Sequence, residues 1–188
     1  MPSLAVATSA EVHTWPFGFG AVLPDDHWLV AHALPRQDKR LADDLARRRI
    51  AGLTFYENRI RQYEKSTQTF QVPLLGGYLF VHLPRERKDE LYATGRVVRI
   101  IDVADPVRLA GDLEALRRLL DAVGDGPLVV RPELVAGKQV VITIGIFAGC
   151  SGVIQRRKDN VHLVVNLPIL GQSVATVIPL ATAELMGI

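Results

Sequence analysis

Few side chains in this sequence could carry out catalysis, and their spacing indicates no active site. Cys150 is the single cysteine, which excludes an intrachain disulfide and a zinc site made of several cysteines. We interpret it as a small turn residue, because no base can be placed beside it. The histidines show no spacing typical of metal ligands, and no Ser/His/Asp set or carboxylate pair is spaced for catalysis. We therefore expect a protein that is not an enzyme and holds no metal or cofactor.

Residues suited to binding are more prominent than residues suited to catalysis. Basic side chains gather in two places, on or beside an expected helix at 38–50 and in the polar stretch 58–69. Such runs usually form a solvated face, and the alternative is a contact with nucleic-acid phosphates, which gives sequence-independent attraction. The candidate nucleic-acid contacts are Arg36, Arg40, Arg47, Arg48, Arg61 and Lys65.

The composition limits what the whole chain can be. Its 188 residues suffice for one ordinary domain or two small ones, and 48% are apolar, which is enough for a core. The formal net charge of +2 argues against a protein that coats nucleic acid through bulk charge. No apolar run approaches the length of a membrane span, and residues 1–16 lack the features of a signal peptide. We expect a cytoplasmic, monomeric protein.

The first part of the chain has a mixed pattern of strands and helices. Residues 1–26, with several prolines and glycines, are expected to be a flexible extension. Strands are predicted at 28–33, 53–56, 78–83 and 97–103. Helices are predicted at 38–50, 84–94 and 113–123, with Asp112 as the N-cap of the last. This order predicts an α+β domain at 27–126, in which helices flank a mixed four-stranded sheet.

The pattern changes after a proline-containing linker at 127–136. Residues 137–154 (GKQVVITIGIFAGCSGVI) alternate like a strand with one buried face, turn between glycines and restart a strand. Further short strands are expected at 161–166 and 174–179. Several short strands at close spacing predict a small β-barrel at 137–188.

Two of these segments resemble motifs of one known family. Residues 137–154 resemble a KOW motif, the strand-turn-strand unit of small SH3-like barrels. Residues 74–81 (LLGGYLFV), with Trp28 at the head of the first strand, resemble the N-terminal NGN domain of the NusG family of transcription elongation factors, which includes antiterminators such as RfaH. The resemblance covers about residues 27–188.

The resemblance implies a transcription elongation factor that modulates pausing, termination or antitermination. The NGN-like domain would bind the clamp helices of the largest RNA polymerase subunit, with Trp28, Leu75, Tyr78 and Phe80 at the positions of the family's contact patch. The KOW domain would recruit Rho or a small-subunit ribosomal protein through a loop tip. The tip residues are Ile146 and Phe147. Upstream or non-template DNA is a further expected partner.

The sequence also departs from the family. Leu75-Gly76-Gly77-Tyr78 stands where the family usually has Phe-Pro-Gly-Tyr, and Ile146 stands where it often has proline. These differences leave open whether the protein is a general factor or a specialised paralogue. The alternative function is a KOW-type RNA-binding or ribosome-associated protein, against which the near-neutral charge argues.

Overall fold

The computed structural model describes residues 6–15, 27–63, 66–124, 126, 128–131, 133, 135–137, 139–143, 145–157 and 160–178. These residues divide into two compact units, each made of segments that are far apart in the sequence. One holds residues 12–57 and 71–110, and the other holds the described parts of 1–11, 58–70 and 111–188. Lys65, a candidate nucleic-acid contact, lies outside the described residues.

The first sheet is larger than the sequence predicts. Its strand order is β1-β3-β5-β2-β6, and β4 pairs with β3. Every recorded register between its strands is antiparallel, so the prediction of a mixed four-stranded sheet is wrong. The strands are β1 (Val6–Trp15), β2 (Trp28–Ala33), β3 (Ala51–Tyr63), β4 (Ser66–Pro73), β5 (Tyr78–His82) and β6 (Val97–Asp102).

Two short helices cover one face of this sheet. Alternate residues of β2 and β5, such as Leu29, Ala31 and Leu79, point to the same buried cluster as Leu41 and Leu45 of α1 (Asp38–Arg47). Leu91 of α2 (Asp89–Tyr92), which follows a 3-10 turn at Arg85–Arg87, joins the cluster. The opposite face of β2 and β5 therefore carries the remaining side chains of these strands.

Residues 6–15 are part of this sheet, although we expected a flexible extension at 1–26. The Trp15 side chain is only 3% exposed and belongs to the helix-covered cluster. Its ring occupies the space above Gly52, where an added Cβ would lie 2.5 Å from a ring carbon. A glycine at this point of β3 is thus what lets the indole pack flat on the sheet.

The long helix α3 (Pro106–Val123) begins earlier than predicted. The Arg108 amide donates to the Asp105 carboxylate at 2.9 Å, so Asp105 caps the helix and Asp112 lies within it. Proline at the first helical position suits this start, because its missing N–H has no partner there in any case. The helix ends at Gly124, whose φ of 54° is left-handed, as the sequence predicts.

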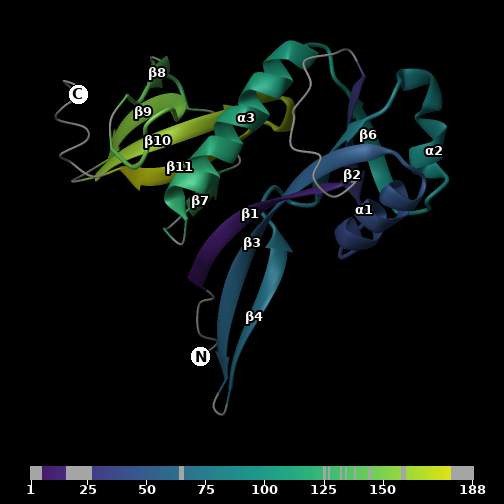
Figure 1. Ribbon diagram of the computed structural model, residues 1–188, viewed down its shortest axis with the longest axis horizontal. Coiled ribbons are helices and arrows are strands. Elements are labelled where there is room, and N and C mark those ends of the chain that lie inside the picture. Colours follow the sequence, from purple (N-terminus) through teal and green to yellow (C-terminus); the bar gives the residue numbers. More distant parts are fainter. Residues whose placement is uncertain are drawn as a thin grey trace. The chain divides into compact units, whose positions relative to one another are not determined.

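The second sheet has the order β7-β11-β10-β9-β8 and is antiparallel at every recorded register. Its strands appear in green to yellow in Figure 1. They are β7 (Leu128–Arg131), β8 (Gln139–Val141), β9 (Ser151–Arg157), β10 (Asn160–Leu167) and β11 (Gln172–Ile178), with a 3-10 turn at Pro168–Leu170. Since β7 pairs with β11, residues 128–131 belong to the sheet and not to a linker.

This second sheet does not close, so the predicted SH3-like barrel is wrong. Among the residues that the structure describes, β7 and β8 form its two edges and do not pair with each other. Closure requires every strand to have two neighbours at a consistent tilt and stagger, and β8 has only three residues. The strand-turn-strand expected at 137–154 is present, because β8 pairs with β9, but it ends in an open edge.

No helix within the described residues is long and apolar enough to cross a membrane.

Candidate protein-binding face of the first sheet

The face of the first sheet opposite the helix-covered cluster carries three cross-strand rows. Alternation along β2 places Trp28, Val30 and His32 on this face. Their direct partners on β5 are His82, Phe80 and Tyr78, in that order. Strand β6 extends two of the rows, since Ile101 pairs with Val30 and Arg99 pairs with His32. The rows bring together residues from three strands that are up to about seventy positions apart in sequence (Trp28 to Ile101).

The row Tyr78–His32–Arg99 is the most accessible and the most polar. The Tyr78 and His32 rings stack with centroids 4.4 Å apart and an interplanar angle of 18°. The Arg99 Nη2 atom donates to the Tyr78 hydroxyl at 2.6 Å, and its guanidinium lies 5.8 Å from the Tyr78 ring centroid. Tyr78 is 8% exposed, His32 is half-buried and Arg99 is exposed. The row presents an aromatic edge and a cation, which are common in protein-binding hot spots.

The middle row is the apolar interior of this face. Phe80 lies opposite Val30 on one side and Leu53 of β3 on the other. Phe80 and Val30 have no exposed surface, and Phe55 packs edge-to-face on Phe80 at 6.2 Å. Phe80 and Val30 therefore support the rows beside them, and the accessible part of this row is the half-buried Ile101.

The third row pairs Trp28 with His82. The two rings meet edge-to-face at 5.5 Å, and His27 packs on the other side of His82 at 5.7 Å. Trp28 is 1% exposed, while His82 is half-buried and His27 is exposed. The histidines thus form the accessible part of this row.

The structure brings three of the four predicted polymerase contacts onto one face. Trp28, Tyr78 and Phe80 belong to the three rows, whereas Leu75 lies in the turn before β5 and is 1% exposed. All four are buried, so only the edge of Tyr78 is accessible among them. Exposed contacts on this face come instead from His32 and Arg99. Neither residue was predicted from the sequence, because their place beside Tyr78 depends on strand register, which a single sequence does not specify.

A cavity of about 330 Å³ lies at the Tyr78 end of the strands. The turn residues Gly76 and Gly77 form one wall, with φ of 67° and 83°. Such angles suit glycine, and they explain the double glycine of the sequence. Arg36 also has a left-handed φ, 62°. The other lining residues are His32, Ala33, Leu34, Pro35, Asp38, Pro73 and Val98.

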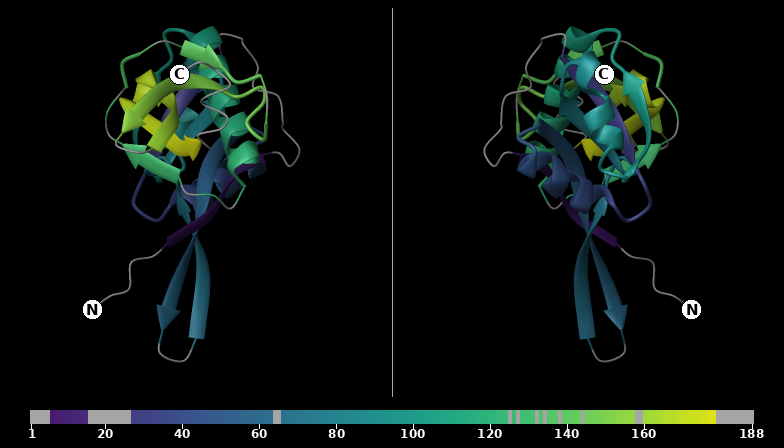
Figure 2. Two further views of the ribbon diagram at one scale, coloured as in Figure 1. Left: turned by 90° about the vertical axis from the view of Figure 1, so that its left-hand side faces the viewer. Right: turned by 90° about the vertical axis from the view of Figure 1, so that its right-hand side faces the viewer.

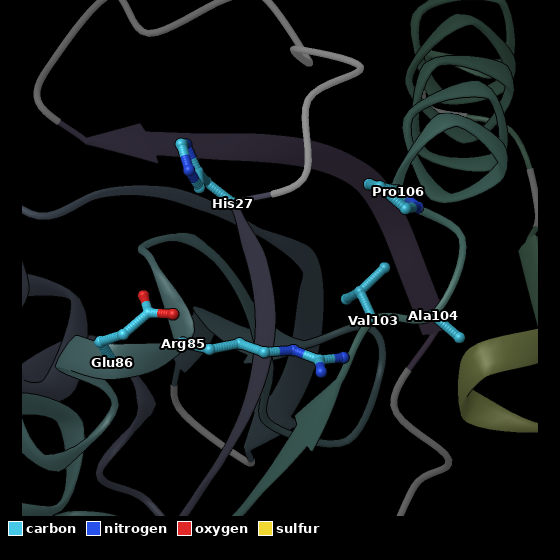
Figure 3. A pocket seen from close by; sticks show the side chains of 6 residues that line it. All are labelled: His27, Arg85, Glu86, Val103, Ala104 and Pro106. Carbon is cyan, nitrogen blue, oxygen red and sulfur yellow. The ribbon is translucent and has the colours of Figure 1, made fainter.

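A second cavity, of about 310 Å³, lies at the opposite end of β2 and β6. Figure 3 shows its lining: the tip of the Arg85 side chain is directed toward Val103, and Glu86 lies on the other side of Arg85 from Val103. Arg85 forms an ion pair with Asp102 at 3.4 Å, which leaves charge of both signs at this cavity. The remaining lining residues are His27, Ala104 and Pro106.

The loop tip of the second sheet differs from the prediction in one residue. Ile146 is 71% exposed, as a contact residue should be, but Phe147 is 3% exposed and packs inward. The turn is closed by bonds from the Cys150 amide to the Phe147 carbonyl and from the Gly149 amide to the Ile142 carbonyl. Cys150 is buried, and burial raises the pKa of its thiol, in agreement with a packing role at this turn.

The described candidate nucleic-acid contacts occupy two separate segments. Arg36, Arg40, Arg47 and Arg48 lie on or next to α1, and Arg61 lies on β3. Arg47 is paired with Asp44, whose second oxygen accepts from Arg96 Nε at 2.6 Å. The bond from Arg96 holds the pKa of the Asp44 carboxyl below its usual value. Part of the α1 charge is thus neutralised by structural ion pairs.

Within the described ranges, no group of three or more His, Cys, Asp or Glu side chains could hold a metal ion. The sequence matches no model of a known protein family. It also matches no curated protein.

Proposed function

We propose that this protein is a transcription elongation factor that binds RNA polymerase and modulates pausing, termination or antitermination. The observation that supports the proposal is the set of three cross-strand rows. Trp28 and Tyr78, which carry part of the resemblance to the NusG family, lie on the neighbouring strands β2 and β5 and share one face of the sheet. Aromatic residues and arginine concentrated on one sheet face are typical of a protein-binding surface.

The contact itself is assigned to the accessible row. Tyr78, His32 and Arg99 offer a ring edge, an imidazole and a guanidinium to a partner, while Phe80 and Trp28 are buried in the two other rows of the same face. The partner is the clamp-helix segment of the largest polymerase subunit. Binding energy, and no covalent chemistry, would shift polymerase toward its pause-resistant state. The second sheet recruits Rho or a ribosomal protein, with Ile146 as its exposed contact.

The test is a pull-down of purified RNA polymerase by the tagged full-length protein. Arg99→Glu is expected to abolish retention, since it reverses the charge of an exposed residue and does not hollow out the core. Tyr78→Ala should weaken retention as well. Tyr92→Ala is the matched control, because Tyr92 is 47% exposed on α2 and belongs to none of the three rows.

Two results would contradict the proposal. One is a wild-type protein that retains no polymerase under conditions in which a known elongation factor does. The other is equal retention by Arg99→Glu and Tyr92→Ala. RNA binding by the protein without any polymerase binding would favour the alternative of an RNA-binding or ribosome-associated protein.

A further inference from the structure

The described part of the chain includes a long β-ribbon whose outer residues are all exposed. The second half of β3 and most of β4 form this ribbon, defined here as the described residues 58–63 and 66–71 (Figure 1). Residues 52–57 of β3 are all buried, whereas residues 61–63 and 66–71 are all exposed. Strand β1 also pairs with β3, but residues 61–63 and 66–71 are exposed. An exposed ribbon of this kind is marginal in water, and its side chains are accessible to a partner.

The side chains of the ribbon have the chemistry of a nucleic-acid contact. Arg59 and Arg61 are the only charged residues within 58–63 and 66–71. By alternation they share one face of β3 with Tyr63, and the Arg61 guanidinium lies 5.8 Å from the Tyr63 ring centroid. Most of the other side chains carry amides or hydroxyls, which bond to base edges and phosphates. They are Asn58, Gln62, Ser66, Thr67, Gln68, Thr69 and Gln71.

The dimensions of the ribbon match the major groove of a duplex. Two paired strands with their side chains fit a groove that is about 12 Å wide. Six residues of extended chain span about 20 Å, which corresponds to about six base pairs at about 3.4 Å per step. The ribbon is strongly twisted in both views of Figure 2, as a free two-stranded ribbon is expected to be.

We propose that the ribbon binds double-stranded DNA by lying in the major groove. Arg59 and Arg61 contact phosphates at the groove edge, and the amide and hydroxyl side chains face the bases. A single strand is less suited to this surface, because Tyr63 is the one aromatic side chain beside the arginines in the described residues 58–63 of β3, whereas single-strand sites stack successive bases on aromatic side chains. The inference does not depend on polymerase binding, since it concerns the protein and DNA alone.

The experiment measures fluorescence anisotropy of a labelled duplex with the full-length protein and no polymerase. A duplex of about 20 base pairs leaves room on both sides of the expected site. Affinity is followed as salt rises from about 50 to about 200 mM, where the slope of log K against log salt reports the phosphates contacted. The double variant Arg59→Ala/Arg61→Ala should flatten this slope by about 1.8, because each lost phosphate contact removes about 0.9.

The control is Lys88→Ala/Arg108→Ala, which removes the same charge from two exposed positions outside the ribbon. It should leave the slope unchanged. An equal loss in both double variants would show that net charge and not the ribbon attracts the DNA, and would overturn the proposal. Tighter binding to a single strand of the same sequence than to the duplex would overturn it too, as would no binding at the lowest salt.

A third variant, Gln62→Ala/Gln68→Ala, separates base contacts from charge. It should leave the salt slope intact and reduce the difference in affinity between duplexes of different sequence, since glutamine reads adenine edges. All changed side chains are exposed, so circular dichroism should show folded protein throughout. Success here with failure of the polymerase pull-down would identify a DNA-binding protein with another partner.

Discussion

The two sheets of this protein fill their interiors in different ways. The helix-covered cluster of the first sheet is built from large side chains, including Trp15, Leu41 and Leu79. One buried cluster of the second sheet consists of the small side chains of Val135, Val153, Val164 and Ala175, although larger side chains such as Leu163 and Leu167 are buried there too. A layer of helices leaves space that large side chains fill, whereas the second sheet has a close backbone approach at Gly152. The helix-covered cluster should therefore be sensitive to lost volume, and the strands beside Gly152 to added volume.

The tryptophans make this comparison measurable. The sequence has two, Trp15 and Trp28, and both belong to the unit that contains residues 12–57. Tryptophan fluorescence thus reports unfolding of the first unit alone, while far-UV circular dichroism reports both. A change that affects only the second sheet should alter the circular dichroism signal and leave the tryptophan fluorescence unchanged.

The largest expected effect is that of Leu79→Ala in the first sheet. Leu79 has no exposed surface and lies in the helix-covered cluster. The lost side chain leaves a cavity that rigid neighbours cannot refill, so the free energy of unfolding should fall by about 2–5 kcal/mol. Tryptophan fluorescence during denaturant unfolding measures this. Val98→Ala is the control, because Val98 is 51% exposed, and it should change stability by less than about 0.5 kcal/mol.

Gly152→Ala tests the opposite sensitivity in the second sheet. A Cβ at this position would lie 2.5 Å from the Val164 carbonyl oxygen, a backbone atom that cannot move aside. We expect destabilisation of about 1–3 kcal/mol, visible in circular dichroism and silent in tryptophan fluorescence. Gly111→Ala in α3, where a Cβ meets nothing within 4 Å, should instead stabilise the helix by about 0.5–1 kcal/mol. Equal effects at the two glycines would refute the proposed close approach.

Individual strands and turns could be predicted from the sequence, but the way in which the strands pair could not. Alternation predicts β2 and β5 closely, and Gly76-Gly77 predicts a sharp turn, because both signals are local. The place of Trp15 in the first sheet was missed, because a strand at the edge of a sheet carries a weak pattern. Closure of the second sheet was predicted wrongly, since short strands alone do not fix which edges pair.

The candidate site shows the same limit. Trp28, Tyr78 and Phe80 could be selected by residue type, but the sequence left open whether they bind a partner or pack in the core, because burial depends on what packs on each face. His32 and Arg99 became visible only through the register that sets them beside Tyr78. Phe147 and Ile146 are neighbours at one turn, and which of them points outward is decided by the hydrogen bonds of that turn.

A smaller effect is expected when the pH falls, and it concerns the stability contributed by α3. Bonds from Arg117 and then Arg118 lower the pKa of Glu114 from 4.5 to about 2. The stability from this lowered pKa is fully present above pH 4.5 and is lost as pH falls toward about 2. Glu114→Gln should therefore remove about 1 kcal/mol of acid-sensitive stability, a value reduced by solvent screening. Circular dichroism across this pH range measures it, with Glu86→Gln as a charge-matched control. An unchanged acid limb in Glu114→Gln would contradict the assignment.

The smallest effect is expected from Tyr78→Phe, which tests the Tyr78–His32–Arg99 row without disturbing the helix-covered cluster. The change removes the bond from Arg99 Nη2 but keeps the ring that stacks on His32. Because Arg99 is exposed and can bond to water instead, the free energy of unfolding should fall by only about 0.5 kcal/mol. Arg99→Ala should cost a similar amount, and the double variant should cost less than the sum, since both changes break the same bond. Additive effects would mean that the bond does not stabilise the row, and Arg99 would then remain a contact only for a partner.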